Sequence, residues 1–182
     1  MVMKILIKFS VVLFFILTNV NETFPQNSHP NLIINQKDVK EMQDALGKYP
    51  LFDEAFQEAK QVVENALTHP IDVPVPKDAG GYAHERHKKN YVEMQLAGVL
   101  FSLTKDERYA AFIRDMLLKY STLYPTLGRH PMTATSEPGR LFWQVLNETV
   151  WMVHVAQAYD CVYDWLKPED REVIETNLLR PM

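Results

Sequence analysis

The sequence predicts an all-α protein built from antiparallel helical hairpins. Two observations indicate this fold class. Apolar residues within 51–66 recur three and four positions apart, which is the spacing of one face of an α-helix. Proline and glycine gather between such segments, as in 69–81, rather than within them. Almost no strand is expected.

The first two helices are expected at 38–46 and 51–66. Asn35 is a good N-cap residue, Asp38 follows three residues later, and Gly47 marks the end of the first helix. Pro50 opens the second helix. The prolines within 69–76 cannot continue it, because each lacks a backbone N–H and favours extended neighbours.

Two further helices are expected at 84–103 and 106–123. The second half of the former, 96–101, is apolar on nearly every face, so neighbouring elements must bury it on several sides. The turn between the two helices has only a few residues, which favours an antiparallel return.

A fifth helix is expected at 139–166, and a sixth begins at Pro168, with Glu169 and Asp170 beside the positive end of its dipole. No repeat of fixed period is present. The hairpins therefore either close as a small bundle or form the front portion of a larger protein, which would leave apolar surface exposed.

Charge and cysteine content exclude several classes of protein. The formal net charge is −4, which gives no general attraction to nucleic acid. The single cysteine, Cys161, excludes an internal disulfide framework and a zinc cluster built from cysteines. Its place within an apolar helix predicts a buried residue.

Residues 1–26 are expected to be a secretory signal peptide. Lys4 and Lys8 form a basic start, and the apolar run 9–17 follows. This run is too short for a membrane span, which needs about 20 apolar residues. An uncleaved anchor is the alternative. Cleavage before Asn27 would leave the chain 27–182 in the periplasm or secreted, with no stable membrane anchor.

The first candidate site lies at the start of the helix expected at 84–103. Basic or polar side chains gather there: His84, Arg86, His87, Lys88, Lys89 and Asn90. A helix N-terminus with such neighbours favours an anion such as a carboxylate. A solvated, charged helix start is the simpler interpretation of the same residues, because exposed charge is common. The H-x-x-H spacing lacks the zincin pattern, so no metal ligand is assigned.

The second candidate site is a polar stripe on the helix expected at 139–166. Its residues follow one another at helical spacing: Arg140, Gln144, Asn147 and Glu148. Trp143 and Trp151 lie close by in the sequence. Amide and guanidinium groups bind sugar hydroxyls and carboxylates, while indole rings stack on sugar faces. A polar seam between helices, with the aromatic residues in the core, is an equally good interpretation.

Other polar residues have no partner that the sequence reveals. His130 is suited to acid or base chemistry, but no residue is placed to orient it. Ser136 lies in no G-x-S-x-G elbow. Asp160 and Asp164 are interpreted as surface residues on the outer side of a helix.

Several long stretches match one known family: 29–33, 77–90, 138–147, 156–164 and 177–181. Together they resemble the N-terminal part of the oligoalginate lyases, which are polysaccharide lyases of family 17 related to the heparinase II/III-type lyases. The resemblance extends from about Ser28 to Arg180. It implies an incomplete α/α toroid of antiparallel helical hairpins, which an antiparallel β-sheet domain follows in the family.

The resemblance also implies an activity. Family members cleave alginate oligosaccharides exolytically by β-elimination. An Asn and a His neutralise the uronate carboxylate, and a Tyr moves the proton. No cofactor is implied. These catalytic groups are expected beyond Met182, so the chain alone is expected to bind sugar weakly at most and to show no turnover.

Substrate contacts are what the resemblance assigns to this chain, with alginate, an anionic uronate oligosaccharide, as the partner. Gln144 matches a family position that lines the sugar cleft, and Arg140 is the next candidate. Further candidates are Asn147, Lys89, Asn90 and His84. Ser136 stands where a Tyr is expected, and Pro138 stands where some relatives carry an Arg.

Two other classes of function stay open. A closed helical bundle would suit a non-catalytic carbohydrate-binding module, and such a module would melt cooperatively. A hydrolase on the same toroid would need two carboxylates flanking the glycosidic bond, and no such pair is recognisable in the sequence.

Overall fold

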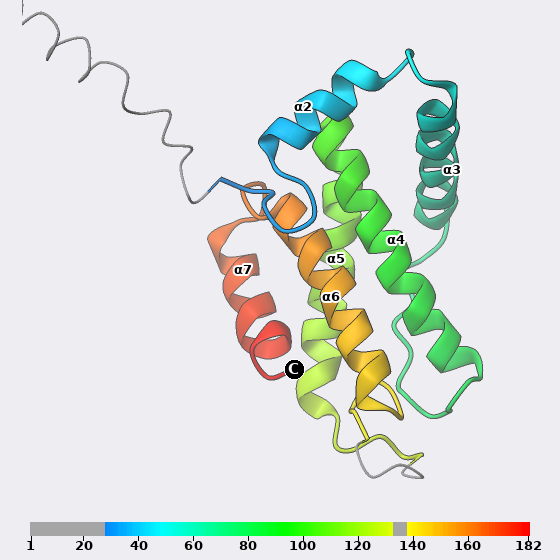
Figure 1. Cartoon of the computed structure of the whole chain (residues 1–182). Coiled ribbons are helices and arrows are strands. Elements are labelled where there is room, and N and C mark those ends of the chain that lie inside the picture. The colour runs from blue at the N-terminus through cyan, green and yellow to red at the C-terminus, as the bar shows by residue number, and fades with distance from the viewer. Residues whose placement is uncertain (1–27, 133–137) are drawn as a thin grey trace, which may run out of the picture.

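The structure is a computed structural model that describes residues 28–132 and 138–182. Within these ranges the chain is helical and contains no strand, which confirms the all-α prediction (Figure 1). The helices are α2 (Gln36–Ala45), α3 (Pro50–Leu67), α4 (Tyr82–Thr104), α5 (Glu107–Leu123), α6 (Val145–Val162) and α7 (Pro168–Ile174). A 3-10 turn, η1 (Tyr124–Thr126), follows α5, and a π-helical turn, η2 (Glu175–Leu179), follows α7. The expected signal peptide and Ser136 lie outside the described residues.

Side-chain caps determine where α2 and α4 begin. The Asn35 side chain accepts hydrogen bonds from the backbone N–H groups of Lys37 and Asp38, and the Asp38 carboxylate accepts one from the Asn35 N–H. This capping box confirms Asn35 as the N-cap residue. At α4, the Asp78 carboxylate accepts bonds from the N–H groups of 81, 83 and 84, each at 3.0 Å. Helix α4 therefore begins slightly earlier than the sequence predicts.

Helices α4 and α6 lie side by side and run in the same direction, and α5 returns antiparallel between them in the chain (Figure 1). The rings of Tyr91 and His154 are 4.5 Å apart, and a Cβ added at Gly98 would lie 3.1 Å from the Cys161 Cβ. Glycine suits this close approach, because a Cβ at position 98 would force its neighbours on α6 to shift slightly. Closure of such hairpins into a toroid stays a prediction.

The centre of the molecule is the interior between α4, α5 and α6. The second half of α4 is largely buried there, as the apolar run predicts, and Cys161 is buried on α6. Large side chains that are fully buried include Met94, Tyr109, Ile113, Met116, Tyr120, Phe142 and Trp151. A dense core of this kind fixes the relative position of the N-terminal ends of α4 and α6.

The predicted start of the fifth helix is wrong. Helix α6 begins at Val145 rather than at 139, and it ends at Val162 rather than at 166. The backbone N–H groups of Arg140, Leu141 and Phe142 instead donate hydrogen bonds to the Glu148 carboxylate. This side chain competes with helical hydrogen bonding, and residues 140–144 form a loop.

The interpretation of Asp160 as a surface residue is also wrong. Its side chain is 4% exposed, and its carboxylate accepts hydrogen bonds from the backbone N–H groups of Asn31 and Leu32 at 2.6 and 2.8 Å. The same carboxylate bonds to the His29 ring, which lies against Tyr163. The segment before α2 folds back over the end of α6 and covers Asp160, whereas Asp164 is exposed.

One face of α6 carries apolar side chains that remain exposed. Leu146 is 67% exposed, and Val150 and Val153 follow it at helical spacing with exposures of 37% and 49%. These residues form an apolar stripe on one face, larger than a single exposed side chain.

Among the helices that the structure describes, none has the length and apolar character needed to cross a membrane.

Candidate functional site

The two sequence-predicted sites lie at the same end of the molecule. Helices α4 and α6 both begin there, and the connections that precede them, 68–81 and 138–144, lie beside one another (Figure 1). The His84 ring packs edge-on against the Phe142 ring, with 5.2 Å between their centroids. The start of α4 and the loop before α6, which are far apart in the sequence, therefore meet at one end of the molecule.

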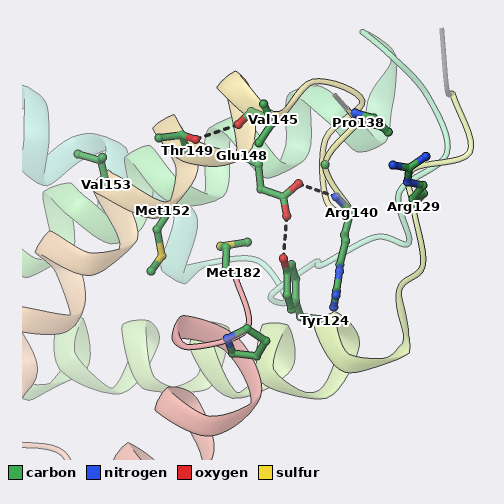
Figure 2. Close-up of a pocket in the computed structure, with 12 residues that line it drawn as sticks. Tyr124, Arg129, Pro138, Arg140, Val145, Glu148, Thr149, Met152, Val153 and Met182 are labelled. Atoms are coloured by element: carbon green, nitrogen blue, oxygen red, sulfur yellow. Dashed lines mark hydrogen bonds between the residues drawn. The ribbon is translucent and has the colours of Figure 1, made fainter. Parts of the chain in front are cut away.

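A hollow of about 540 Å³ opens at this end, between the start of α6, η1 and the C-terminal residues (Figure 2). Its described lining is Tyr124, Arg129, Pro138, Gly139, Arg140, Val145, Glu148, Thr149, Met152, Val153, Pro181 and Met182. Two guanidinium groups and an apolar wall thus share one concave surface. We call it the α6 hollow.

Arg140 and Arg129 are the cations in the described lining of the α6 hollow, and both are exposed to solvent. Figure 2 shows the Arg140 side chain lying beside the Tyr124 ring, and its Cζ is 5.4 Å from the ring centroid. This contact orients the guanidinium without consuming its N–H donors. A carboxylate that enters the hollow can therefore accept two hydrogen bonds from one guanidinium.

Glu148 is the acidic side chain in the described lining of the α6 hollow, and it is engaged by the protein itself. Its Oε2 accepts hydrogen bonds from the backbone N–H groups of Arg140, Leu141 and Phe142 at 2.6, 3.1 and 3.4 Å. Its Oε1 accepts one from the Tyr124 hydroxyl at 2.9 Å. Burial, together with the adjacent Glu148 carboxylate, holds the pKa of the Tyr124 hydroxyl well above its usual range.

Gln144 and Asn147 stand beside the α6 hollow but not in its described lining. Gln144 is the N-cap residue of α6, and its side chain makes no capping hydrogen bond. Asn147 lies in the first turn, and both side chains are half-buried. The expected helical stripe does not exist as one helix face, because Arg140 and Gln144 precede the helix.

The α4 candidates have different surroundings. His84 and Asn90 are buried, and burial lowers the pKa of His84. The Asn90 side-chain amide donates to the Asp72 carbonyl and to the Tyr120 hydroxyl, both at 2.8 Å. The anion at this helix start is the carboxylate of the chain's own Asp78.

Lys89 lies on another face of α4. It is exposed, and its Nζ is 3.6 Å from the carboxylate of Glu93, which is 1% exposed. This pair lines a second hollow, of about 500 Å³, between α3 and α4. Its other residues are Asn65, Ala66, His69, Pro70, Asp72, Tyr82 and Arg86. Of the six predicted contacts, Arg140 lines the α6 hollow and Lys89 lines the second hollow. His84 and Asn90 lie in the protein interior, and Gln144 and Asn147 stand beside the α6 hollow.

His130 holds the loops together in the structure. Its backbone N–H donates to the Gly139 carbonyl at 2.9 Å, and its Nδ1 accepts a bond from the Met132 N–H at 3.1 Å. The ring is buried, and burial lowers its pKa. His130 is not among the described lining residues of the α6 hollow.

Sequence reasoning missed Arg129 and Tyr124 as lining residues of the α6 hollow. Arg129 stands in the loop next to His130, and a basic residue beside a candidate histidine was the available signal. Tyr124 follows α5 directly, and its contact with Glu148 joins residues that are distant in the sequence.

Among the described residues, no group of three or more His, Cys, Asp or Glu side chains is placed to hold a metal ion.

Comparison with known proteins gives a consistent result. No protein-family model matches the chain. It is 43% identical over 157 residues to a protein named exo-oligoalginate lyase from Saccharophagus degradans, which is 86% of this chain and 21% of that protein. It is 47% identical over 136 residues to a protein named alginate lyase from Stenotrophomonas maltophilia, which is 74% of this chain and 18% of that protein.

The chain thus spans about a fifth of the length of the curated relatives that it matches. Identity of this level over such a long stretch supports the resemblance to alginate lyases that the sequence motifs indicate.

Proposed function

We propose that this chain is part of an exported alginate lyase, and that its α6 hollow binds a uronate unit of an alginate oligosaccharide. The observation that carries the proposal is the 43–47% identity to two proteins named as alginate lyases. The two arginines in the described lining of the hollow support it independently, because a uronate is a sugar that carries a carboxylate.

The finer assignments are part of the same proposal. The protein is a polysaccharide lyase of family 17 within the heparinase II/III-like group, and its hairpins belong to an α/α toroid. Residues 1–26 direct its export to the periplasm or the medium. The reaction is a β-elimination from the end of the oligosaccharide.

This reaction shows what a cation in the hollow would contribute. A base removes the proton at C5 of the uronate, the electron pair forms a C4–C5 double bond, and the bond from C4 to the glycosidic oxygen breaks. The leaving oxygen takes up a proton. Negative charge moves onto the carboxylate as the C5 proton leaves, and fixed hydrogen-bond donors at that group lower the barrier.

We assign binding, rather than proton transfer, to the described residues of the α6 hollow. The Tyr124 hydroxyl already donates to Glu148, and the Glu148 carboxylate is occupied by its own chain. Arg140 and Arg129 would bind the uronate carboxylate, and Val145 and Val153 would contact the C–H face of the ring. Gln144 and Asn147 would extend this surface to the neighbouring sugar hydroxyls.

The Arg140→Ala substitution is expected to lower the affinity for a uronate trimer by about tenfold, because it removes a charge-assisted, two-point contact. Isothermal titration calorimetry with trimannuronate and triguluronate measures the change. Added salt should weaken the wild-type binding as well, because the contact is largely electrostatic and exposed. The control is Lys48→Ala, which removes an exposed cation that is not among the described lining residues of the α6 hollow. Equal affinities of the two variants would contradict the assignment.

The chain 27–182 on its own is expected to release no unsaturated uronate from alginate oligosaccharides. An absorbance assay for the C4–C5 double bond checks this, with mass spectrometry of the products. Appearance of the double bond would mean that the proton-transfer groups lie within this chain. A product without a double bond would indicate a hydrolase instead. Sugar binding by a full-length protein that lacks lyase activity would favour the carbohydrate-binding module.

A further inference from the structure

One buried carboxylate organises the loop that carries Arg140. The Glu148 side chain comes from the first turns of α6 and reaches back to three consecutive N–H groups, those of 140, 141 and 142. Figure 2 shows the bond to the Arg140 N–H. Three successive N–H groups that converge on one oxygen form a concave anion site within the backbone. Here the anion is the chain's own side chain, which is 6% exposed as a residue.

The loop shape depends on this contact at close range. A Cβ added at Gly139 would lie 1.8 Å from Glu148 Oε2 and 2.8 Å from the Phe142 carbonyl oxygen. The position therefore admits only glycine while the carboxylate is in place. On the other side, the Tyr124 hydroxyl holds Oε1, and the Tyr124 ring supports the Arg140 guanidinium. The carboxylate thus connects the backbone and the side-chain support of Arg140.

An acidic residue in the wall of an anion-binding hollow is expected to repel the ligand. Glu148 escapes this difficulty because its two oxygens accept four hydrogen bonds from the protein. Those donors offset the charge locally. Burying a carboxylate costs free energy unless donors are placed to bond it. The loop must therefore keep its three N–H groups turned toward Glu148, so Glu148 stabilises this loop conformation.

We propose that Glu148 is a positioning residue for uronate binding: it sets the direction of Arg140 and the path of the chain to Gln144 without touching the sugar. The inference rests on the function proposed above. It goes beyond that function because it makes tight binding of an acidic sugar depend on an acidic side chain.

The two roles that Glu148 could play, as a repulsive charge or as a positioning residue, predict opposite changes in uronate affinity for the same substitution. If Glu148 acted only through its charge, Glu148→Gln would strengthen uronate binding by removing a repulsive group. A positioning role predicts weaker binding, by about tenfold, because a neutral amide oxygen holds the three N–H groups less strongly than a carboxylate does. Affinity for trimannuronate and triguluronate is measured by calorimetry, with circular dichroism to verify folding. Glu172→Gln, an exposed acid on α7, is the matched control and should leave the affinity unchanged.

A double-mutant cycle with Arg140→Ala makes the test specific. In a positioning role, Glu148→Gln acts through Arg140, so the double variant should bind about as weakly as the single Arg140→Ala variant. If the losses of affinity in the two single variants add up in the double variant, or if Glu148→Gln binds as tightly as the wild type or more tightly, the positioning role is overturned. The proposed function would still stand in that case, because the wild-type protein binds the sugar. Absence of any wild-type binding would overturn both.

A milder variant covers the case in which Glu148→Gln does not fold. Tyr124→Phe removes one of the four donors and keeps the ring under Arg140. It should weaken binding by about threefold, an effect that Arg140→Ala again abolishes. Unchanged affinity in this variant would count against the positioning role.

Discussion

Replacing Asp160 with asparagine is expected to lower the free energy of unfolding by about 3 kcal/mol, because this one buried carboxylate holds residues 29–32 of the segment before α2. It accepts hydrogen bonds from the N–H groups of Asn31 and Leu32 and from the His29 ring. An asparagine has one acceptor oxygen and presents N–H donors where the carboxylate presents a second acceptor. At least one of the three donors would therefore lose its partner.

Chemical denaturation of wild type and Asp160→Asn measures the change in stability. Hydrogen exchange at the Asn31 and Leu32 amides reports whether the segment is released before the rest of the fold opens. Asp164→Asn is the matched control, since Asp164 is exposed and lies one turn further along the chain. Equal stabilities of the two variants would show that the contacts of Asp160 are replaced by water without cost.

The second large effect expected is a loss of stability in mild acid that originates at His87. The ring is fully buried, its Nδ1 hydrogen-bonds to the Tyr120 hydroxyl at 2.8 Å, and burial lowers its pKa to about 4. Asp72 and Asp78 act in the opposite direction but do not overcome the cost of burying a charge. The folded protein therefore keeps His87 neutral at pH values where the unfolded chain would bind a proton.

The sign of the pH dependence follows from linkage. Well above pH 6.5 the ring is neutral in both states, so this stability is fully present. As the pH falls from 6.5 toward 4, the unfolded state takes up a proton that the folded state does not, and stability is lost. The loss between pH 7 and pH 5 is about 2 kcal/mol. Burial lowers the pKa of His84 as well, which adds to the effect in the same direction.

Denaturation curves at pH 7, 6 and 5 measure this slope above the range in which carboxylates titrate. The variant His87→Gln cannot titrate, so its stability should change much less between pH 7 and pH 5, whatever its stability at pH 7. His69→Gln replaces an exposed histidine and should keep the wild-type slope. An unaltered slope in His87→Gln would assign the acid sensitivity to another group.

Much of the fold is predictable because its signals are local. The capping box of Asn35 and Asp38 involves residues three apart, and the sequence is sufficient to recognise it. Pro50 and Pro168 likewise open α3 and α7, as expected of proline in a first turn. The burial of the second half of α4 follows from its composition, since no single partner could cover so many apolar faces.

The candidate site is less predictable, because it depends on contacts between distant residues. Periodicity alone continues a helix through Arg140 and Gln144, and it cannot show that Glu148 accepts hydrogen bonds from the backbone of that segment. For the same reason Asp160 looks like a surface residue on its own helix. The segment that covers it is more than a hundred residues away in the sequence.

The sequence by itself therefore determined the helical class, most helix boundaries, the buried character of α4 and the resemblance to alginate lyases. Short-range hydrogen bonds and the period of the α-helix carry these features. Only the tertiary structure decided which polar groups face solvent, which hold loops, and which line a hollow. A carboxylate such as Glu148 becomes an anchor only when folding brings donors from other segments to it and removes the water that would otherwise satisfy them.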